Sequence, residues 1–234
     1  MVEGETRAAV ALAERLAAVR ERVALAAEQS GREPESVRIV GVSKTVGRDA
    51  VDEAFRAGLL DFGENRVQDA LRKFDPPLAD DVTLHLIGYL QTNKARDAVS
   101  LFHVVHSLDR VALADALQQR AEAAGKVLTV LLQVNIAGEA QKHGAMPEDA
   151  AALLQHTLSL ENLRVAGLMT IAPLVQGAEE ARPVFRGLRE LRDDLQQHAG
   201  MALPELSMGM TNDFVVAIAE GATMVRVGRA IFGG

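Results

Sequence analysis

The sequence of 234 residues contains no cysteine and no tryptophan, and it has a single tyrosine. Without cysteine the chain can form no disulfide, no thiolate metal site and no cysteine nucleophile. Aromatic residues make up only 3% of the chain, which argues against a platform for stacking nucleic-acid bases. The lack of cysteine is compatible with a reducing compartment, and we expect the protein to be cytoplasmic.

Long apolar runs and an excess of positive charge are also missing. No apolar run approaches 18 residues, so we expect no membrane span. The first residues, MVEGETRAAV, lack the basic start and the apolar core of a signal peptide. The formal net charge of -7 disfavours binding to bulk nucleic acid or to anionic membranes. Hydrophobic residues nevertheless make up 48% of the chain, which predicts a globular protein with a large core.

The order of the apolar segments predicts an α/β barrel. Residues 5–29 carry apolar side chains at helical spacing, so residues 1–31 are expected to form a leading helix that ends at Gly31. After it, short β-branched or apolar runs alternate with longer helix-like segments. The expected strands are residues 37–43, 59–65, 82–88, 102–108, 128–136, 163–172, 205–209 and 224–228.

Eight strands that alternate with helices favour a single (β/α)8 TIM-type barrel with an additional N-terminal helix, spanning residues 1–234. An open doubly wound sheet is the alternative, because it also alternates strands and helices. The barrel is favoured by the strand count and by the lack of a glycine-rich dinucleotide loop after the first strand. No linker rich in proline or serine divides the chain, so we expect no second domain.

In such a barrel the functional residues lie at the carboxyl ends of the strands. Candidate site residues, most of them polar residues or glycines, lie at or near the end of every expected strand. In chain order they are Lys44; Glu64 and Asn65; His85 and Gly88; His106, Ser107 and Asp109; Asn135; Met169 and Thr170; Ser207, Gly209, Thr211 and Asn212; and Arg226, Gly228 and Arg229.

Lys44 is one of only five lysines, and it leaves a strand expected to be buried. Partial desolvation of its ammonium would lower its pKa and give a neutral amine that can form a Schiff base with an aldehyde. An ion pair with a carboxylate such as Glu64 is the alternative, and the local sequence leaves both open. A P-loop is rejected because Ser43 stands where that motif needs glycine.

The segment SMGMTNDF (207–214) indicates an anion cradle. Gly209 would allow close backbone approach, and Ser207 and Thr211 would add hydroxyls to the free amides of a helix start. Gly228 could complete the cradle, and Asp213 is expected to point outward. Ordinary helix capping is the alternative.

Arg226 lies inside the last expected strand, and a buried arginine needs a partner. That partner would be either an acid in an ion pair or an atom of a ligand. The six histidines show no metal-binding spacing, and no GxSxG elbow is present. We therefore expect no metal site and no hydrolytic triad.

Several motifs together resemble the pyridoxal phosphate homeostasis protein family, which is itself similar to the barrel domain of alanine racemase. The resemblance covers about residues 37–234. It rests on VSKT (42–45), DFGENRVQ (61–68), HLIGYLQTNK (85–94), HSLD (106–109), LLQVNI (131–136), KHG (142–144), GLMTI (167–171), LSMGMTNDF (206–214) and MVRVGRAIFG (224–233).

The resemblance implies a single barrel that holds pyridoxal 5′-phosphate (PLP) as an internal aldimine, a Schiff base, on Lys44. Arg226 would face the pyridine nitrogen, and Asn65 and Met169 would line the site. The residues implied around the phosphate are Ser207, Gly209, Thr211 and Gly228. The role of Lys142-His143-Gly144 is left open, with an ordinary loop as the simplest interpretation.

The resemblance also implies a cofactor carrier that keeps free PLP, a form of vitamin B6, low and supplies it to PLP-dependent apo-enzymes. No catalytic residue is expected: an arginine cannot accept the ring-nitrogen proton, and no second base is evident. The alternative is a racemase or lyase that uses the same aldimine, with Tyr89 or His85 as base. A third interpretation is a cofactor-free barrel isomerase acting on a phosphosugar, with Lys44 electrostatic. We expect a monomer.

Overall fold

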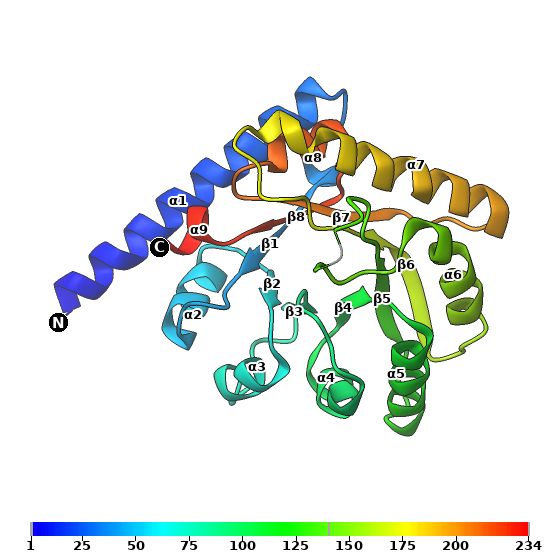
Figure 1. Cartoon of the computed structure of the whole chain (residues 1–234). Coiled ribbons are helices and arrows are strands. Elements are labelled where there is room, and N and C mark those ends of the chain that lie inside the picture. The colour runs from blue at the N-terminus through cyan, green and yellow to red at the C-terminus, as the bar shows by residue number, and fades with distance from the viewer. Residues whose placement is uncertain (1, 140, 234) are drawn as a thin grey trace.

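Eight parallel strands form the centre of the computed structural model, which describes residues 2–139 and 141–233. They pair in sequence order, and β8 returns to pair with β1, so the sheet is closed (Figure 1). The expected (β/α)8 barrel is therefore confirmed. The strands are β1 (Arg38–Val42), β2 (Asp61–Glu64), β3 (Thr83–Leu86), β4 (Val104–Leu108), β5 (Leu128–Gln133), β6 (Leu163–Met169), β7 (Glu205–Met210) and β8 (Met224–Val227).

Helices surround the barrel, and their order matches the expected alternation. The α-helices are α1 (Val2–Gln29), α2 (Arg48–Arg56), α3 (Val67–Lys73), α4 (Ala95–Leu101), α5 (Val111–Ala123), α6 (Ala150–Leu158), α7 (Arg182–Ala199), α8 (Phe214–Ala219) and α9 (Arg229–Phe232). Short 3-10 helices are η1 (Pro34–Ser36), η2 (Thr92–Lys94), η3 (Pro147–Asp149) and η4 (Ala178–Ala181). Helix α9 was not expected from the sequence, and α8 begins only at Phe214, the last residue of the segment 207–214 in which the sequence indicates a helix start.

Helix α1 is the expected leading helix. Its apolar face, which includes Leu12, Leu16, Val19 and Val23, is buried. The helix packs against α2, α8 and α9, so it covers the outside of the barrel where the first and last strands meet (Figure 1). Among the described helices, none combines the length and the hydrophobicity needed to cross a membrane.

Side chains alternate between the inside of the barrel and the surrounding helices, as the two-residue period of a strand requires. A small apolar cluster fills part of the interior and consists of Val40, Leu131, Met169 and Met224. Outward-facing residues such as Leu132 join the larger core beneath the helices. The alternation decides which residues can reach a cavity at the end of the barrel.

Close packing between β6 and β7 gives a test of the register. Gly167 pairs with Glu205, and a Cβ at position 167 would overlap the carbonyl oxygen of Glu205. We expect Gly167→Ala to lower the free energy of unfolding by about 1–3 kcal/mol, because the backbones would have to move apart. Urea denaturation measures this change.

Gly47→Ala is the matched control. Within the described part of the chain, no heavy atom lies within 4 Å of a Cβ built on Gly47. This substitution should change the free energy of unfolding by no more than about 1 kcal/mol in either direction. Equal effects of the two substitutions would contradict the register between β6 and β7.

Candidate functional site

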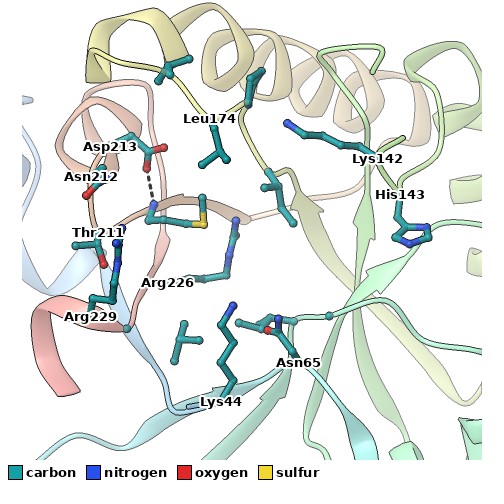
Figure 2. A pocket seen from close by; sticks show the side chains of 18 of the residues that line it. Lys44, Asn65, Lys142, His143, Leu174, Thr211, Asn212, Asp213, Arg226 and Arg229 are labelled. Atoms are coloured by element: carbon teal, nitrogen blue, oxygen red, sulfur yellow. Dashed lines mark hydrogen bonds between the residues drawn. The ribbon is translucent and has the colours of Figure 1, made fainter. Parts of the chain in front are cut away.

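A cavity of about 700 Å³ opens at the carboxyl ends of the strands. Small-molecule sites typically have volumes of about 300–1,000 Å³, so this cavity is large enough for a cofactor-sized ligand. Figure 2 shows its lining. Among the described residues, the charged lining consists of four cationic side chains and one acid: Lys44, Lys142, Arg226, Arg229 and Asp213. The lining is thus locally positive in a chain whose net charge is -7.

Lys44 follows β1 and extends into this cavity, where its amine points toward Arg226 (Figure 2). Val40 belongs to the cluster inside the barrel and Val42 lines the cavity, so the alternation of β1 continues to Lys44. The sequence predicted a partly desolvated ammonium, and this prediction is wrong. Lys44 is exposed, because the cavity is open above it.

The alternative in which Lys44 pairs with Glu64 is also wrong. Glu64 faces away from the cavity and is 1% exposed, and its Oε1 lies 2.6 Å from Nζ of Lys73 on α3. Ser43 Oγ donates a hydrogen bond to the same oxygen at 2.7 Å. Lys73 also donates to the Ser43 carbonyl oxygen at 2.6 Å. This buried group fixes the end of β1 and leaves the Lys44 amine to the cavity.

Asn65 and Tyr89 line the cavity from the segments after β2 and β3. The two segments touch, because a Cβ on Gly88 would overlap the carbonyl oxygen of Asn65. The Tyr89 ring stacks on His143, with ring centroids 3.9 Å apart. The guanidinium of Arg110 lies 5.0 Å from the Tyr89 ring centroid. The only phenol of the chain is therefore held at the wall of the cavity by neighbours from the segments after β4 and β5.

The segment after β5 brings Lys142 and His143 to the cavity wall. It folds back onto the strand, because the Ala145 amide donates to the Gln133 carbonyl oxygen at 2.8 Å and the Asn135 amide donates to the Ala145 carbonyl oxygen at 2.9 Å. The motif whose role the sequence left open thus forms one side of the site (Figure 2).

Thr211 and Gly228 also line the cavity, as the anion-cradle prediction requires. The outward orientation predicted for Asp213 is wrong. This residue is 6% exposed and lines the cavity, and its Oδ1 accepts a hydrogen bond from the Met210 amide. The reason is that α8 begins only at Phe214, so Asp213 occupies the capping position. Burial raises the pKa of the Asp213 carboxyl, although the Met210 amide and Arg226 oppose this shift.

Arg226 projects from β8 into the floor of the cavity and is only 4% exposed. One terminal nitrogen donates to the Thr170 carbonyl oxygen at 2.8 Å, and the other donates to Ser207 Oγ at 2.6 Å. Burial lowers the pKa of Arg226 to about 10, which leaves it charged at neutral pH. Its hydrogen-bond partners within the described residues are neutral oxygens, so its charge remains available to a ligand.

Three of the residues predicted to contact a ligand do not line the cavity: Met169, Ser207 and Gly209. Met169 belongs to the apolar cluster inside the barrel, and Ser207 is buried beneath Arg226. Gly209 has a φ of +91°, and a Cβ there would lie 2.6 Å from the Ala217 Cβ. Gly209 therefore lets α8 pack closely on β7. A direct contact of these three with a cofactor stays a prediction.

The loop after β6 forms a wall that the sequence did not identify. Pro173, Leu174 and Val175 line the cavity, and Leu174 is 98% exposed at the rim (Figure 2). These residues are apolar and come directly after the expected strand end at residue 172, while the observed strand β6 already ends at Met169. No motif marks them, and only their closeness to a strand end could have drawn attention to them.

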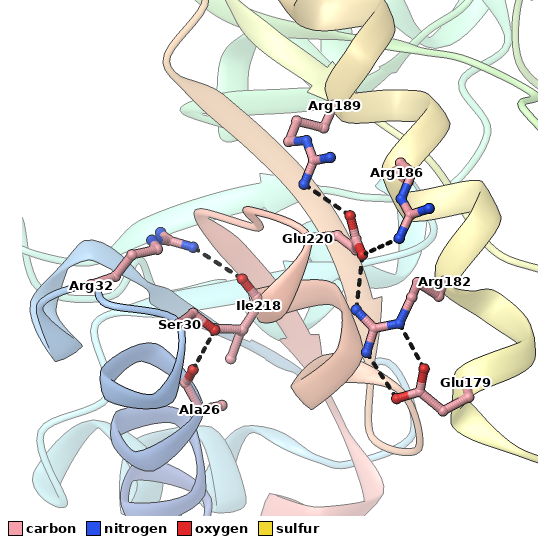
Figure 3. A network of polar contacts seen from close by, with 9 residues as sticks. All are labelled: Ala26, Ser30, Arg32, Glu179, Arg182, Arg186, Arg189, Ile218 and Glu220. Atoms are coloured by element: carbon pink, nitrogen blue, oxygen red, sulfur yellow. Dashed lines mark hydrogen bonds and ion pairs between the residues drawn. The ribbon is translucent and has the colours of Figure 1, made fainter.

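An ion-pair network on the outside of the barrel joins the C-terminal end of α8 to α7 (Figure 3). Glu220, at the end of α8, lies 2.8 Å from Arg182, 3.4 Å from Arg186 and 2.8 Å from Arg189, all on α7. Burial alone would raise the pKa of Glu220, but the arginines lower it below its usual value. The network therefore ties the C-terminal end of α8 to α7.

No cluster of three or more His, Cys, Asp or Glu side chains suited to a metal ion occurs in residues 2–139 and 141–233.

Comparisons with known proteins place this geometry in context. The family model described as "Alanine racemase, N-terminal domain" matches residues 15–234. The pyridoxal phosphate homeostasis protein of Aquifex aeolicus (strain VF5) is 47% identical over 220 residues, which cover 94% of this chain and 96% of the relative. The protein of the same name from Pseudomonas aeruginosa PAO1 is 45% identical over 223 residues, or 95% of each chain.

Solved structures of other proteins are similar to this chain as well. PipY of Synechococcus elongatus PCC7942, determined with PLP bound, is similar with a TM-score of 0.82 and 41% identity, covering 95% of this chain and all of that one. Alanine racemase of Clostridium difficile 630 has a TM-score of 0.69 and 14% identity, covering 85% of this chain and 53% of that one. At that identity the likeness concerns the fold.

The buried pair of Glu64 and Lys73 gives a prediction about how the end of β1 is held. We expect Glu64→Gln to lower the free energy of unfolding by about 3–5 kcal/mol, because it leaves the charge of Lys73 buried without its partner. The Lys73 side chain is 11% exposed, so water cannot replace the lost carboxylate. Urea denaturation at neutral pH measures the effect.

The matched control is Arg72→Met on the same helix. Arg72 pairs with Asp69 at the surface, where an ion pair contributes at most about 1 kcal/mol. A Glu64→Gln variant no less stable than Arg72→Met would contradict the buried ion pair.

Proposed function

Because the chain belongs to the pyridoxal phosphate homeostasis protein family, we propose that it binds pyridoxal 5′-phosphate in the cavity at the carboxyl end of the barrel. The observation that carries the proposal is the meeting of Lys44, Arg226 and Thr211 in one space. The protein would hold the cofactor through Lys44 and act in intracellular PLP homeostasis. We place it in the cytoplasm, as expected from the sequence.

The residues present fit each part of this cofactor. The excess of positive charge in the lining suits a phosphate, and the Thr211 hydroxyl and the backbone at Gly228 lie at the same wall. Asn65 and Tyr89 add polar and aromatic surface to the lining. A cavity of about 700 Å³ accommodates a single substituted ring with its phosphate.

Lys44 supplies the primary amine for an aldehyde. In its neutral form this amine would add to the aldehyde carbon with loss of water, and Lys44 would then hold the cofactor as a lysine aldimine. The exposure of Lys44 supports this step, since both the incoming aldehyde and the departing water need access. Bound PLP supplies an electron sink, and the strength of that sink depends on the group that faces the pyridine nitrogen.

Arg226 is the group proposed to face that nitrogen. It is a permanent donor at neutral pH and cannot accept the proton of a pyridinium, so it would keep the ring nitrogen unprotonated. An unprotonated ring is a weak electron sink. This favours holding the cofactor over using it to break bonds at an amino-acid α-carbon.

The alternative of a racemase or lyase needs a second acid–base group facing the ligand. His85 is not suited, because it is fully buried and both ring nitrogens are engaged, with Asp61 at 2.9 Å and with His106 at 2.8 Å. Tyr89 remains as the candidate, and it is exposed at the rim. With His85 excluded as a base, the open cavity agrees better with a carrier that releases PLP to apo-enzymes. We propose that this carrier acts as a monomer.

One prediction concerns the attachment of the cofactor to Lys44. Protein loaded with PLP should be yellow, and borohydride reduction should attach the cofactor to Lys44, as mapped by peptide mass spectrometry. Lys44→Ala should fold normally and lose the visible aldimine band. Lys126→Ala is the control, since Lys126 lies outside the cavity lining and its loss should leave the band intact. A colourless wild-type protein that takes up no cofactor would contradict both the carrier function and the racemase alternative.

Another prediction distinguishes a cofactor carrier from a racemase or lyase. In deuterated water, the loaded protein should exchange the α-protons of L-amino acids no faster than free PLP does, because Arg226 would hold the ring nitrogen unprotonated and weaken the electron sink. Mass spectrometry of the amino acids measures the exchange. Exchange at enzyme-like rates that Tyr89→Phe abolishes would instead establish the racemase alternative.

A further inference from the structure

A continuous chain of hydrogen bonds runs through the inside of the barrel beneath the cavity. Arg226 donates to Ser207 Oγ at 2.6 Å, and Ser207 Oγ lies 2.9 Å from His106 Nδ1. His106 Nε2 lies 2.8 Å from His85 Nδ1, and His85 Nε2 lies 2.9 Å from Asp61 Oδ1. The chain crosses from β8 through β7, β4 and β3 to β2.

The interior of a barrel of this kind is usually filled by branched apolar side chains. Here His85, His106 and Ser207 are fully buried in it. Polar groups in such a place destabilise the fold unless every donor and acceptor is paired. The members of the chain meet this condition only in one arrangement of protons.

That arrangement follows from the two ends. A guanidinium can only donate, so Ser207 Oγ accepts from Arg226. Among the described residues, the Ser207 hydroxyl proton then finds an acceptor only at His106 Nδ1, so pairing this proton requires Ser207 to donate to His106. The Asp61 carboxylate can only accept, so His85 carries its proton on Nε2 and accepts at Nδ1. His106 then donates from Nε2, and both rings are neutral.

The electrostatic environment agrees with a neutral His106. Burial lowers the pKa of His106 well below its usual value, and the positive charges of Arg226 and Arg38 lower it further. At the far end Asp61 lies 3.8 Å from Arg38, whose side chain is partly exposed at the opposite mouth of the barrel. The chain therefore begins at a carboxylate held by one arginine and ends at the arginine that faces the cavity.

We infer that Asp61, His85 and His106 are positioning residues that act through Ser207 to hold the Arg226 guanidinium against the ring of the bound ligand. The inference rests on the proposed function for the identity of that ligand. With one terminal nitrogen fixed by Ser207 and the other by the Thr170 carbonyl oxygen, the plane of the guanidinium is set. The hydroxyl proton of Ser207 is committed to His106, so this residue supports Arg226 and has no proton left to donate to a phosphate.

Ser207→Ala and His106→Leu test the chain, together with the double variant. Each single substitution should weaken PLP binding roughly ten- to a hundredfold, the equivalent of one hydrogen bond to a charged group, and should shift the visible absorption of bound PLP. The double variant should be no worse than either single one, because both break the same chain. PLP titration monitored by absorbance gives both readouts.

Leu132→Ala is the control for destabilisation alone. Leu132 is fully buried but faces the helices outside the barrel, away from the hydrogen-bonded side chains inside it. It should lower stability and leave the absorption of bound PLP unchanged. The inference is overturned if His106→Leu binds PLP as the wild type does, if the two single effects add, or if Leu132→Ala shifts the absorption in the same way.

Histidine-ring ¹⁵N NMR of the protein without PLP gives an independent readout. His85 and His106 should both be neutral at neutral pH with the proton on Nε2. A cationic His106, or one protonated on Nδ1, would overturn the inference. Because this measurement needs no cofactor, it stands even if PLP uptake by the wild-type protein fails, so the failure of the proposed function and the failure of the inference are distinguishable.

Discussion

The pairing of β1 with β8 closes the sheet, and the geometry of the site depends on this closure. In the register observed, Val40 of β1 lies beside Arg226 of β8. Lys44, which follows β1, and Arg226 therefore face the same space although about three-quarters of the chain separates them. In an open sheet with the same strand order, these two strands would form opposite edges. The amine would then lie far from both the guanidinium and the Thr211 wall.

Much of this arrangement follows from the sequence because strands in a barrel obey simple rules. Eight apolar runs predicted eight strands, and reading the ends of those strands identified Lys44, Asn65, Thr211, Arg226 and Gly228 as residues that meet, as the cavity shows. The two-residue alternation could also have settled the question that the sequence left open. Asn65 faces the cavity, and successive side chains of a strand point to opposite sides. The preceding residue, Glu64, must therefore face outward, where it pairs with Lys73.

Other features depend on local geometry that the sequence does not display. Register shifts interrupt the pairing at β4, β5 and β7, so the orientation of His106 and Ser207 cannot be counted from the strand ends. Asp213 faces the cavity because α8 begins later than the pattern TND suggests. The apolar wall around Leu174 comes from a loop without a repeating pattern, and loops of this kind are placed by tertiary contacts.

Two networks of polar side chains hold different elements near the cavity. On the outside, Glu220 binds the arginines of α7 and fixes α8 (Figure 3). On the inside, the hydrogen-bonded chain from Asp61 ends at Arg226 beneath the ligand space. A crystal structure of the protein loaded with PLP tests the central claim most directly. The account predicts density that joins Lys44 Nζ to the cofactor, with Arg226 facing the pyridine nitrogen and the phosphate beside Thr211. A cofactor bound in another orientation, or attached to another lysine, would contradict it.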